Sequence, residues 1–189
     1  MRVRQISLYA GVFALILADM ACTMNIGGPS YPNRSIPVST EALGDLTSAL
    51  GTAFANAAVS GQVTLNLTES QITSYLAYKL QAQSQPFITN PQVYLQDGEL
   101  QVYGTATQGY FQATVSLVFS AGVDEHGNLK IQLTSANFGP FPVPNGLTEF
   151  ATTTIQEAYT GALGPVATGF RIQSVTIADG SMNIVGQTK

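Results

Sequence analysis

Residues able to perform nucleophilic, acid–base or metal chemistry are scarce in this sequence. It has one histidine and one cysteine among 189 residues, which excludes a zinc site built from those two ligand types. His126 lies in the tripeptide Glu125-His126-Gly127, a composition typical of a solvated turn. The sequence contains no Gly-x-Ser-x-Gly pattern to present a catalytic serine and no nucleotide-binding glycine loop. We therefore expect no metal and no cofactor.

Two carboxylates can catalyse hydrolysis without other groups, so the acidic residues need individual assignments. Turns and helix starts account for six of them: Asp97 and Asp179 in Asp-Gly hairpin turns, Asp124 and Glu125 in a loop, and Glu69 and Glu149 in first turns of helices. Because each has a structural role, we expect a protein that is not an enzyme. Two carboxylates adjacent in a cleft, one of them held protonated, would instead indicate a hydrolase.

Apolar and aromatic side chains offer a different kind of site. An apolar cleft between helices and a curved sheet would suit an acyl chain, because few charges would lose their hydration. The candidate ligand-contacting residues lie on the apolar faces of the expected helices and strands: Tyr75, Leu76, Phe111, Val115, Phe119, Phe150 and Tyr159. Small residues on the same face of the strands would leave room for a ligand or mark close helix packing: Gly104, Ala106, Ala113 and Ala121. The alternative for the aromatic residues is an ordinary place in the core.

The charge content limits the possible partners. Only 10% of the residues are charged and the net charge is −4, against an average charged fraction of about 25%. Without a basic stripe to neutralise phosphates, nucleic-acid binding is not expected. Electrostatic attraction to anionic membranes is not expected either.

The N-terminal part has the composition of an export signal. Arg2 and Arg4 precede an apolar run from Leu8 to Ala18, which is shorter than the roughly 20 residues of a membrane span. Cys22 ends "LADMAC", which resembles the site at which bacterial lipoproteins are cleaved and acylated. The alternatives are secretion without lipidation and an uncleaved anchor. We therefore assign 1–22 to a signal peptide or lipoprotein signal, 23–39 to a flexible linker rich in Gly and Pro, and 40–189 to one domain.

Three helices are expected within the domain, residues 40–189. Apolar residues at spacings of three and four predict a helix over 40–58, with Ser39 or Thr40 as its cap. Thr68 and Gln71 have the spacing of a capping box that opens a second helix. Asn145 is expected to cap a third helix, which Gly161 and Gly164-Pro165 end.

Alternating apolar residues and turn signals predict antiparallel hairpins. A turn at Asp97-Gly98 pairs Leu95 with Leu100 and Val93 with Val102. A turn at Gln108-Gly109 pairs Ala106 with Phe111, Gly104 with Ala113 and Val102 with Val115. A loop at 125–127 pairs Val123 with Leu129, Ala121 with Ile131 and Phe119 with Leu133. These pairings place the apolar residues on one face, so they predict a four-stranded meander. A last hairpin at Asp179-Gly180 pairs Ile177 with Met182 and Val175 with Ile184.

The two Asp-Gly hairpins align without a gap. The stretch "VYLQDGELQVYG" begins at Val93 and "VTIADGSMNIVG" begins at Val175; a helix beginning Leu-Thr-Glu precedes each. The match indicates a structural repeat, although two Asp-Gly hairpins also arise independently. In both cases the predicted fold class is α+β, with a long curved antiparallel sheet, formed by the meander and the C-terminal hairpin, packed on amphipathic helices.

Several stretches together resemble a known family. "LTESQITSYL", "PQVYLQDGELQVYG", "GVDEHGNLKIQL", "GPFPVP" and "VTIADGSMNIVG" are similar to bacterial envelope proteins related to LmeA, and the layout is also similar to YpmS-like and YceB-like envelope lipoproteins. The resemblance covers roughly 63–189. It implies a simplified BPI-like (tubular lipid-binding, TULIP) fold and a phospholipid or fatty-acid-like ligand. It implies no catalytic residues.

The resulting hypothesis is an exported, membrane-tethered, non-enzymatic domain of the bacterial cell envelope that binds a lipid or other apolar ligand. Its membrane contact would be the N-terminal anchor. The alternative is an envelope scaffold with a closed core that interacts with other proteins. A continuous cavity under the sheet would favour the first hypothesis over the second.

Overall fold

The computed structural model describes residues 24–84, 86–108, 111–161 and 164–189. The predicted signal, its lipidation candidate Cys22 and Thr23 lie outside these residues. Within the described ranges, no helix combines the length and apolar character needed to cross a membrane.

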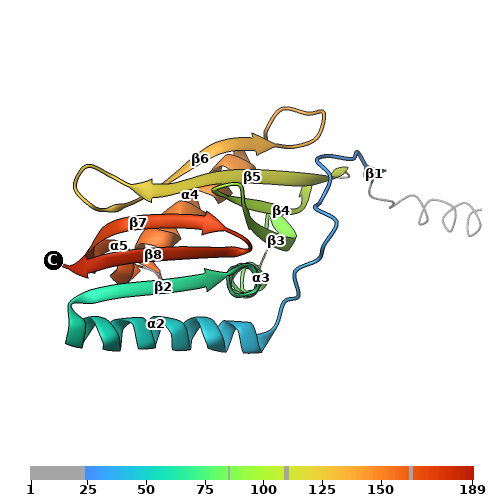
Figure 1. Ribbon diagram of the computed structural model, residues 1–189. Helices are drawn as coiled ribbons and strands as arrows, with labels where there is room; N and C mark the ends of the chain where they lie inside the picture. Colours follow the sequence, from blue (N-terminus) through green and yellow to red (C-terminus); the bar gives the residue numbers. More distant parts are fainter. Residues whose placement is uncertain (1–23, 85, 109–110, 162–163) are drawn as a thin grey trace, which may run out of the picture.

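The elements follow one another as shown in Figure 1. They are β1 (Met24–Asn25), α2 (Thr40–Ser60), β2 (Gln62–Thr68), α3 (Glu69–Gln81), β3 (Ile88–Gln96), β4 (Glu99–Gln108), β5 (Phe111–Val123), β6 (Leu129–Asn137), α4 (Asn145–Thr160), α5 (Gly164–Gly169), β7 (Phe170–Ala178) and β8 (Ser181–Thr188). The predicted α+β class is confirmed.

Local capping explains where the first two long helices begin. The Ser39 hydroxyl accepts a hydrogen bond of 3.1 Å from the Ala42 N–H, which confirms Ser39 as the cap of α2. The capping box of Thr68 and Gln71 at α3 is also present. The prediction for α4 was wrong in its cap: the N-cap is Pro144, without a side-chain hydrogen bond, and Asn145 is the first helical residue. The short helix α5 was not predicted.

The strands form two hydrogen-bonded sheets. One contains β3, β4, β5 and β6 as the predicted antiparallel meander, with β1 added parallel to β5. The other has the order β2-β8-β7, because β2 pairs along its whole length with β8. The C-terminal hairpin is therefore completed by β2 rather than by a meander strand. Figure 1 shows β7 running beside β5, with α4 and α5 behind the strands and α2 along the other side of β2.

Most predicted strand pairings are confirmed. Those of the two Asp-Gly hairpins and of β5 with β6 are present as expected. The register of β4 against β5 differs by two residues: Ala106 pairs with Ala113, and Gln108 pairs with Phe111. Because side chains alternate with a period of two, this shift leaves the same residues on the inner face.

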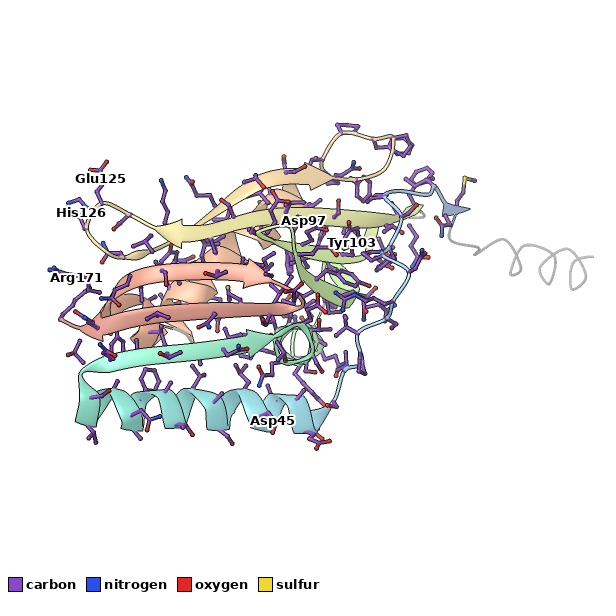
Figure 2. The ribbon with its side chains drawn as sticks, viewed as in Figure 1. Asp45, Asp97, Tyr103, Glu125, His126 and Arg171 are labelled. Carbon is purple, nitrogen blue, oxygen red and sulfur yellow. The ribbon has the colours of Figure 1, made fainter. Side chains whose placement is uncertain are left out.

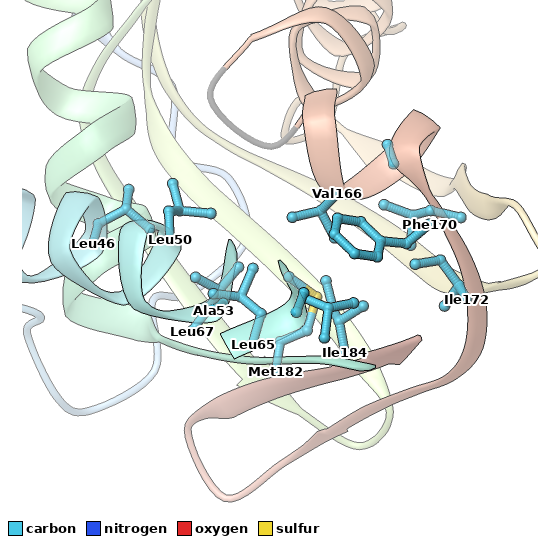
Figure 3. Close-up of a cluster of buried hydrophobic side chains, with 14 of the residues drawn as sticks. Leu46, Leu50, Ala53, Leu65, Leu67, Val166, Phe170, Ile172, Met182 and Ile184 are labelled. Atoms are coloured by element: carbon cyan, nitrogen blue, oxygen red, sulfur yellow. The ribbon is translucent and has the colours of Figure 1, made fainter. Parts of the chain in front are cut away.

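Buried apolar side chains form two clusters. The first joins α2, β2, α5 and the C-terminal hairpin, and Figure 3 shows Leu50, Leu65 and Phe170 among its members. The second joins the inner face of the meander to α3 and α4, with Leu117 and Leu147 fully buried. The helices are therefore held to the sheets by two separate apolar contacts.

A flexible linker was predicted over 23–39, and the structure describes residues 24–39 of it packed on the rest of the domain. Ile36 is buried, and its N–H donates to Gln92 Oε1 at 2.6 Å. The Tyr94 hydroxyl donates to the Arg34 carbonyl oxygen at 2.5 Å. The Tyr31 and Tyr103 rings lie 5.5 Å apart. The segment is bound to the outer face of the meander because it covers aromatic side chains that would otherwise be exposed there.

Candidate functional site

An apolar cavity of about 190 Å³ lies between α3, α4 and the inner face of the meander. Its lining residues are Ile72, Tyr75, Leu76, Lys79, Leu80, Gln83, Val93, Leu100, Val102, Phe119, Ala121, Ile131, Phe150, Thr153, Thr154, Ile155, Glu157 and Met182. The lining is mostly apolar and one side is open. A site of this kind fits the chain of a lipid better than a polar ligand.

The cavity lies where the two core clusters meet. Ile72, Leu100 and Ile131 contact both clusters, and all three line the cavity. Met182 of β8 reaches it from the first cluster and Phe119 of β5 from the second. The cavity therefore lies at the boundary between the two clusters.

A polar contact between α3 and α4 lies at the rim of the cavity. Lys79 Nζ is 2.8 Å from Glu157 Oε1, and the Tyr75 hydroxyl donates to the same oxygen at 2.9 Å. Lys79 Nζ also lies 5.7 Å from the centre of the Tyr75 ring. These three residues connect the helices on either side of the open cavity.

Electrostatics at the rim follow from this contact. The hydrogen bond from Lys79 lowers the pKa of Glu157, and the hydrogen bond from Tyr75 lowers it further. The hydrogen bond to Glu157 raises the pKa of Lys79. Both groups are therefore charged at neutral pH.

The contribution of this contact to stability should disappear in acid. Because the pKa of Glu157 is lower in the folded than in the unfolded state, its stabilisation is present above the ordinary pKa of a glutamate and is lost as the pH falls through the folded value. We expect Glu157→Gln to lower the urea midpoint slightly at pH 7, because exposed pairs contribute little. The difference should vanish in strong acid. Glu149→Gln, on the same helix but exposed, is the control for the loss of a carboxylate that has no partner on α3. A Glu157→Gln difference that is independent of pH would contradict the assignment.

The predicted ligand-contacting residues divide into two groups. Tyr75, Leu76, Phe119 and Phe150 line the cavity. Three do not: Val115 is fully buried in the second cluster, the Tyr159 hydroxyl bonds the backbone of β6 at Leu129 and Ile131, and Phe111 is exposed at the start of β5.

The small residues of the inner face also divide. Ala121 lines the cavity. Gly104, Ala106 and Ala113 are buried in close packing; a Cβ on Gly104 would meet Ile88 Cγ2. Sequence reasoning missed Lys79 and Glu157. Their pairing joins separate helices, so only the spacing of Tyr75 and Lys79 on one helix face was visible in the sequence.

A second, more open groove lies between the two Asp-Gly turns and is lined in part by Arg34, Asp97 and Asp179. Arg34 forms an ion pair with Glu69 beside it. Among the described residues, no group of three His, Cys, Asp or Glu side chains is placed to hold a metal ion. The apolar cavity is therefore the stronger candidate for a ligand site.

Fold and site together define an α+β protein with an apolar cavity between two helices and a curved sheet. No model of a protein family matches the sequence, and no curated protein matches it. Among solved structures, a crystal structure of a lipopolysaccharide binding protein is similar over 68% of this chain and 49% of that chain, with 12% sequence identity and a TM-score of 0.25. The chain thus spans about half the length of that protein. The likeness is weak and assigns neither a family nor a ligand.

Proposed function

We propose that this chain is a non-enzymatic domain that binds a lipid or another apolar ligand in the cavity between α3, α4 and the meander. The observation that carries the proposal is the cavity itself, partly open and lined mainly by apolar side chains. Burial of each CH₂ group contributes about 0.8 kcal/mol. A fatty-acid or phospholipid chain could therefore bind without any charged contact.

The proposed location is the bacterial cell envelope, outside the cytoplasm. The apolar run from Leu8 to Ala18 and the acylation-like site at Cys22 support export and a membrane tether. The tether would keep the cavity near a source of lipid. The finer relationship to LmeA-like proteins, which rests on the turn and strand patterns, is part of the same proposal.

The experiment is native mass spectrometry of the intact chain purified from a bacterial host, followed by organic extraction. A co-purified phospholipid or fatty acid at fixed stoichiometry would support the proposal and identify the ligand class. A bare protein mass that stays unchanged after incubation with lipid vesicles would favour the alternative, a scaffold that binds other proteins.

Filling the cavity should weaken binding. Ala121→Leu adds apolar volume at the cavity wall and should displace two or three CH₂ groups of a bound chain, so we expect the affinity for a fluorescent fatty acid to fall by roughly tenfold or more. Ala58→Leu is the matched control, because Ala58 is an exposed residue of α2 outside both the cavity and the second groove. Unchanged affinity in folded Ala121→Leu would show that the ligand binds elsewhere.

A further inference from the structure

One end of the molecule collects exposed apolar side chains from three separate segments. Met24 of β1 pairs with Phe111 at the start of β5. The loop that follows β6 lies against the segment just after β1, since a Cβ on Gly139 would be 3.2 Å from Gly28 Cα. Figure 1 shows β1, the start of β5 and this loop at the same end of the domain.

The exposure at this end is unusual for the molecule. Met24 is 62% exposed, Phe111 and Phe141 are each 48% exposed, and Val143 is 38% exposed. We call these four residues the apolar end. They are four of the six large apolar side chains that are exposed in the described part of the chain. Exposed large apolar side chains gathered at one end of a domain are typical of a surface that contacts another apolar phase.

The charge distribution points in the same direction. The three segments that meet here, 24–33, 100–123 and 131–148, contain no Asp, Glu, Lys or Arg. Figure 2 places Glu125, His126 and Arg171 at the opposite end of the domain. The apolar end can therefore leave water without stripping the hydration of any formal charge.

The N-terminal residues outside the described part of the chain connect to the domain at the apolar end. Residues 1–23 join the domain at Met24, and they contain the uncharged apolar run from Leu8 to Ala18. An uncleaved anchor containing this run, or an acylated Cys22 left after cleavage, would attach the domain to the bilayer next to Met24 and so hold Met24 and its partner Phe111 near the membrane surface.

We propose that the apolar end docks onto the surface of a lipid bilayer, with Phe111, Phe141, Val143 and Met24 inserted at the level of the headgroups and upper acyl chains. The contact needs no anionic lipid, because the surface carries no basic residues. It is separate from the ligand cavity, since none of the four residues lines it. Docking in this orientation would direct the charged end of the domain away from the membrane.

The absence of tryptophan from the chain allows a direct test. The full chain carrying Phe141→Trp is reconstituted with phosphatidylcholine vesicles, with and without bromine atoms on the acyl chains, which quench nearby tryptophan. We expect a shift of the emission to shorter wavelength and a severalfold loss of intensity with the brominated lipid. Phe111→Trp, on a different segment, should behave in the same way.

His126→Trp is the matched control at the opposite, charged end, and its emission should be the same with both lipids. If Phe141→Trp and Phe111→Trp are not quenched, the proposal is wrong. A shift to shorter wavelength without quenching would also overturn it, because it would mean that the N-terminal segment or a second copy of the chain covers the apolar end. Either result leaves the cavity test with Ala121→Leu unaffected.

Discussion

Replacing Glu69 with alanine is expected to lower the free energy of unfolding by about 3 kcal/mol. Glu69 is the first residue of α3, and its side chain is only 6% exposed. Its Oε1 accepts a hydrogen bond of 2.8 Å from the Leu95 N–H, and its carboxylate forms an ion pair with Arg34. The substitution leaves a buried N–H without an acceptor and a guanidinium without its partner.

Glu69 has this weight because several segments meet at it. The Glu69 N–H donates to the Gly180 carbonyl oxygen at 3.2 Å, and the Gly180 N–H donates to the Leu95 carbonyl oxygen at 3.0 Å. One residue thus connects the start of α3, both Asp-Gly hairpins and, through Arg34, the segment before α2. Loss of the Glu69 side chain should therefore weaken the contacts among these elements, and not only the start of α3.

Urea unfolding of four variants separates the contributions. Glu69→Gln keeps an acceptor for Leu95 and should lose less stability than Glu69→Ala. Arg34→Ala should also lose less, because the Arg34 side chain is half-exposed. Glu149→Ala is the control: Glu149 occupies the corresponding place after Leu-Thr in the second copy of the repeat, but it is exposed. Equal effects at Glu69 and Glu149 would contradict the role assigned to Glu69.

The sequence predicted those features that depend on neighbouring residues. The Thr68–Gln71 capping box is a local hydrogen-bond pattern, and it is present. Both Asp-Gly turns adopt positive φ at their two central residues, with Asp97 at 55° and Asp179 at 50°. A two-residue turn fixes the pairing of its strands, so the registers of these hairpins followed directly from the sequence.

Features that depend on distant segments were not predictable in the same way. The pairing of β2 with β8 joins the middle of the chain to its end. Residues 109 and 110, between β4 and β5, lie outside the described residues, and the strand register differs there by two residues from the predicted one. The segment 24–39 has the composition of a linker, but the aromatic face of the meander gives it a surface to bind.

In the candidate site, too, some features depend on neighbouring residues and others on distant segments. Phe119 and Phe150 follow from strand alternation and helix periodicity, and both line the cavity. The space itself depends on how two core clusters meet, which no single element encodes. Small residues in the strands did not by themselves predict the position of the cavity. The space beside Gly104 is filled by the Ile88 side chain, whereas the space beside Ala121 is part of the cavity.

The repeated hairpins share more than their turns. In the first hairpin the strand pairing is irregular between Thr89 and Gln92, opposite Gly104. In the second it is irregular between Ile172 and Ser174, opposite Gly186. Each copy of the repeat thus ends with a glycine that faces a β-bulge in its partner strand. A bulge alters the path of the partner strand, and that strand then leaves no room for a side chain at the last residue of each copy. This explains why glycine stands there.

We therefore expect Gly186→Ala to lower the free energy of unfolding by roughly 2 kcal/mol. A Cβ at this position would lie 2.9 Å from the Arg171 carbonyl oxygen and 3.3 Å from Ile172 Cα, and these backbone atoms can move only with the strand. Gly104→Ala should lose at least as much, because a Cβ there would overlap Cγ2 of the fully buried, β-branched Ile88 and lie 3.2 Å from the Thr89 carbonyl oxygen. Gly122→Ala is the matched control in a strand with nothing within 4 Å, and alanine there should be neutral or slightly stabilising. Chemical denaturation measures all three, and equal midpoints for Gly186→Ala and Gly122→Ala would show that the bulge does not restrict this position.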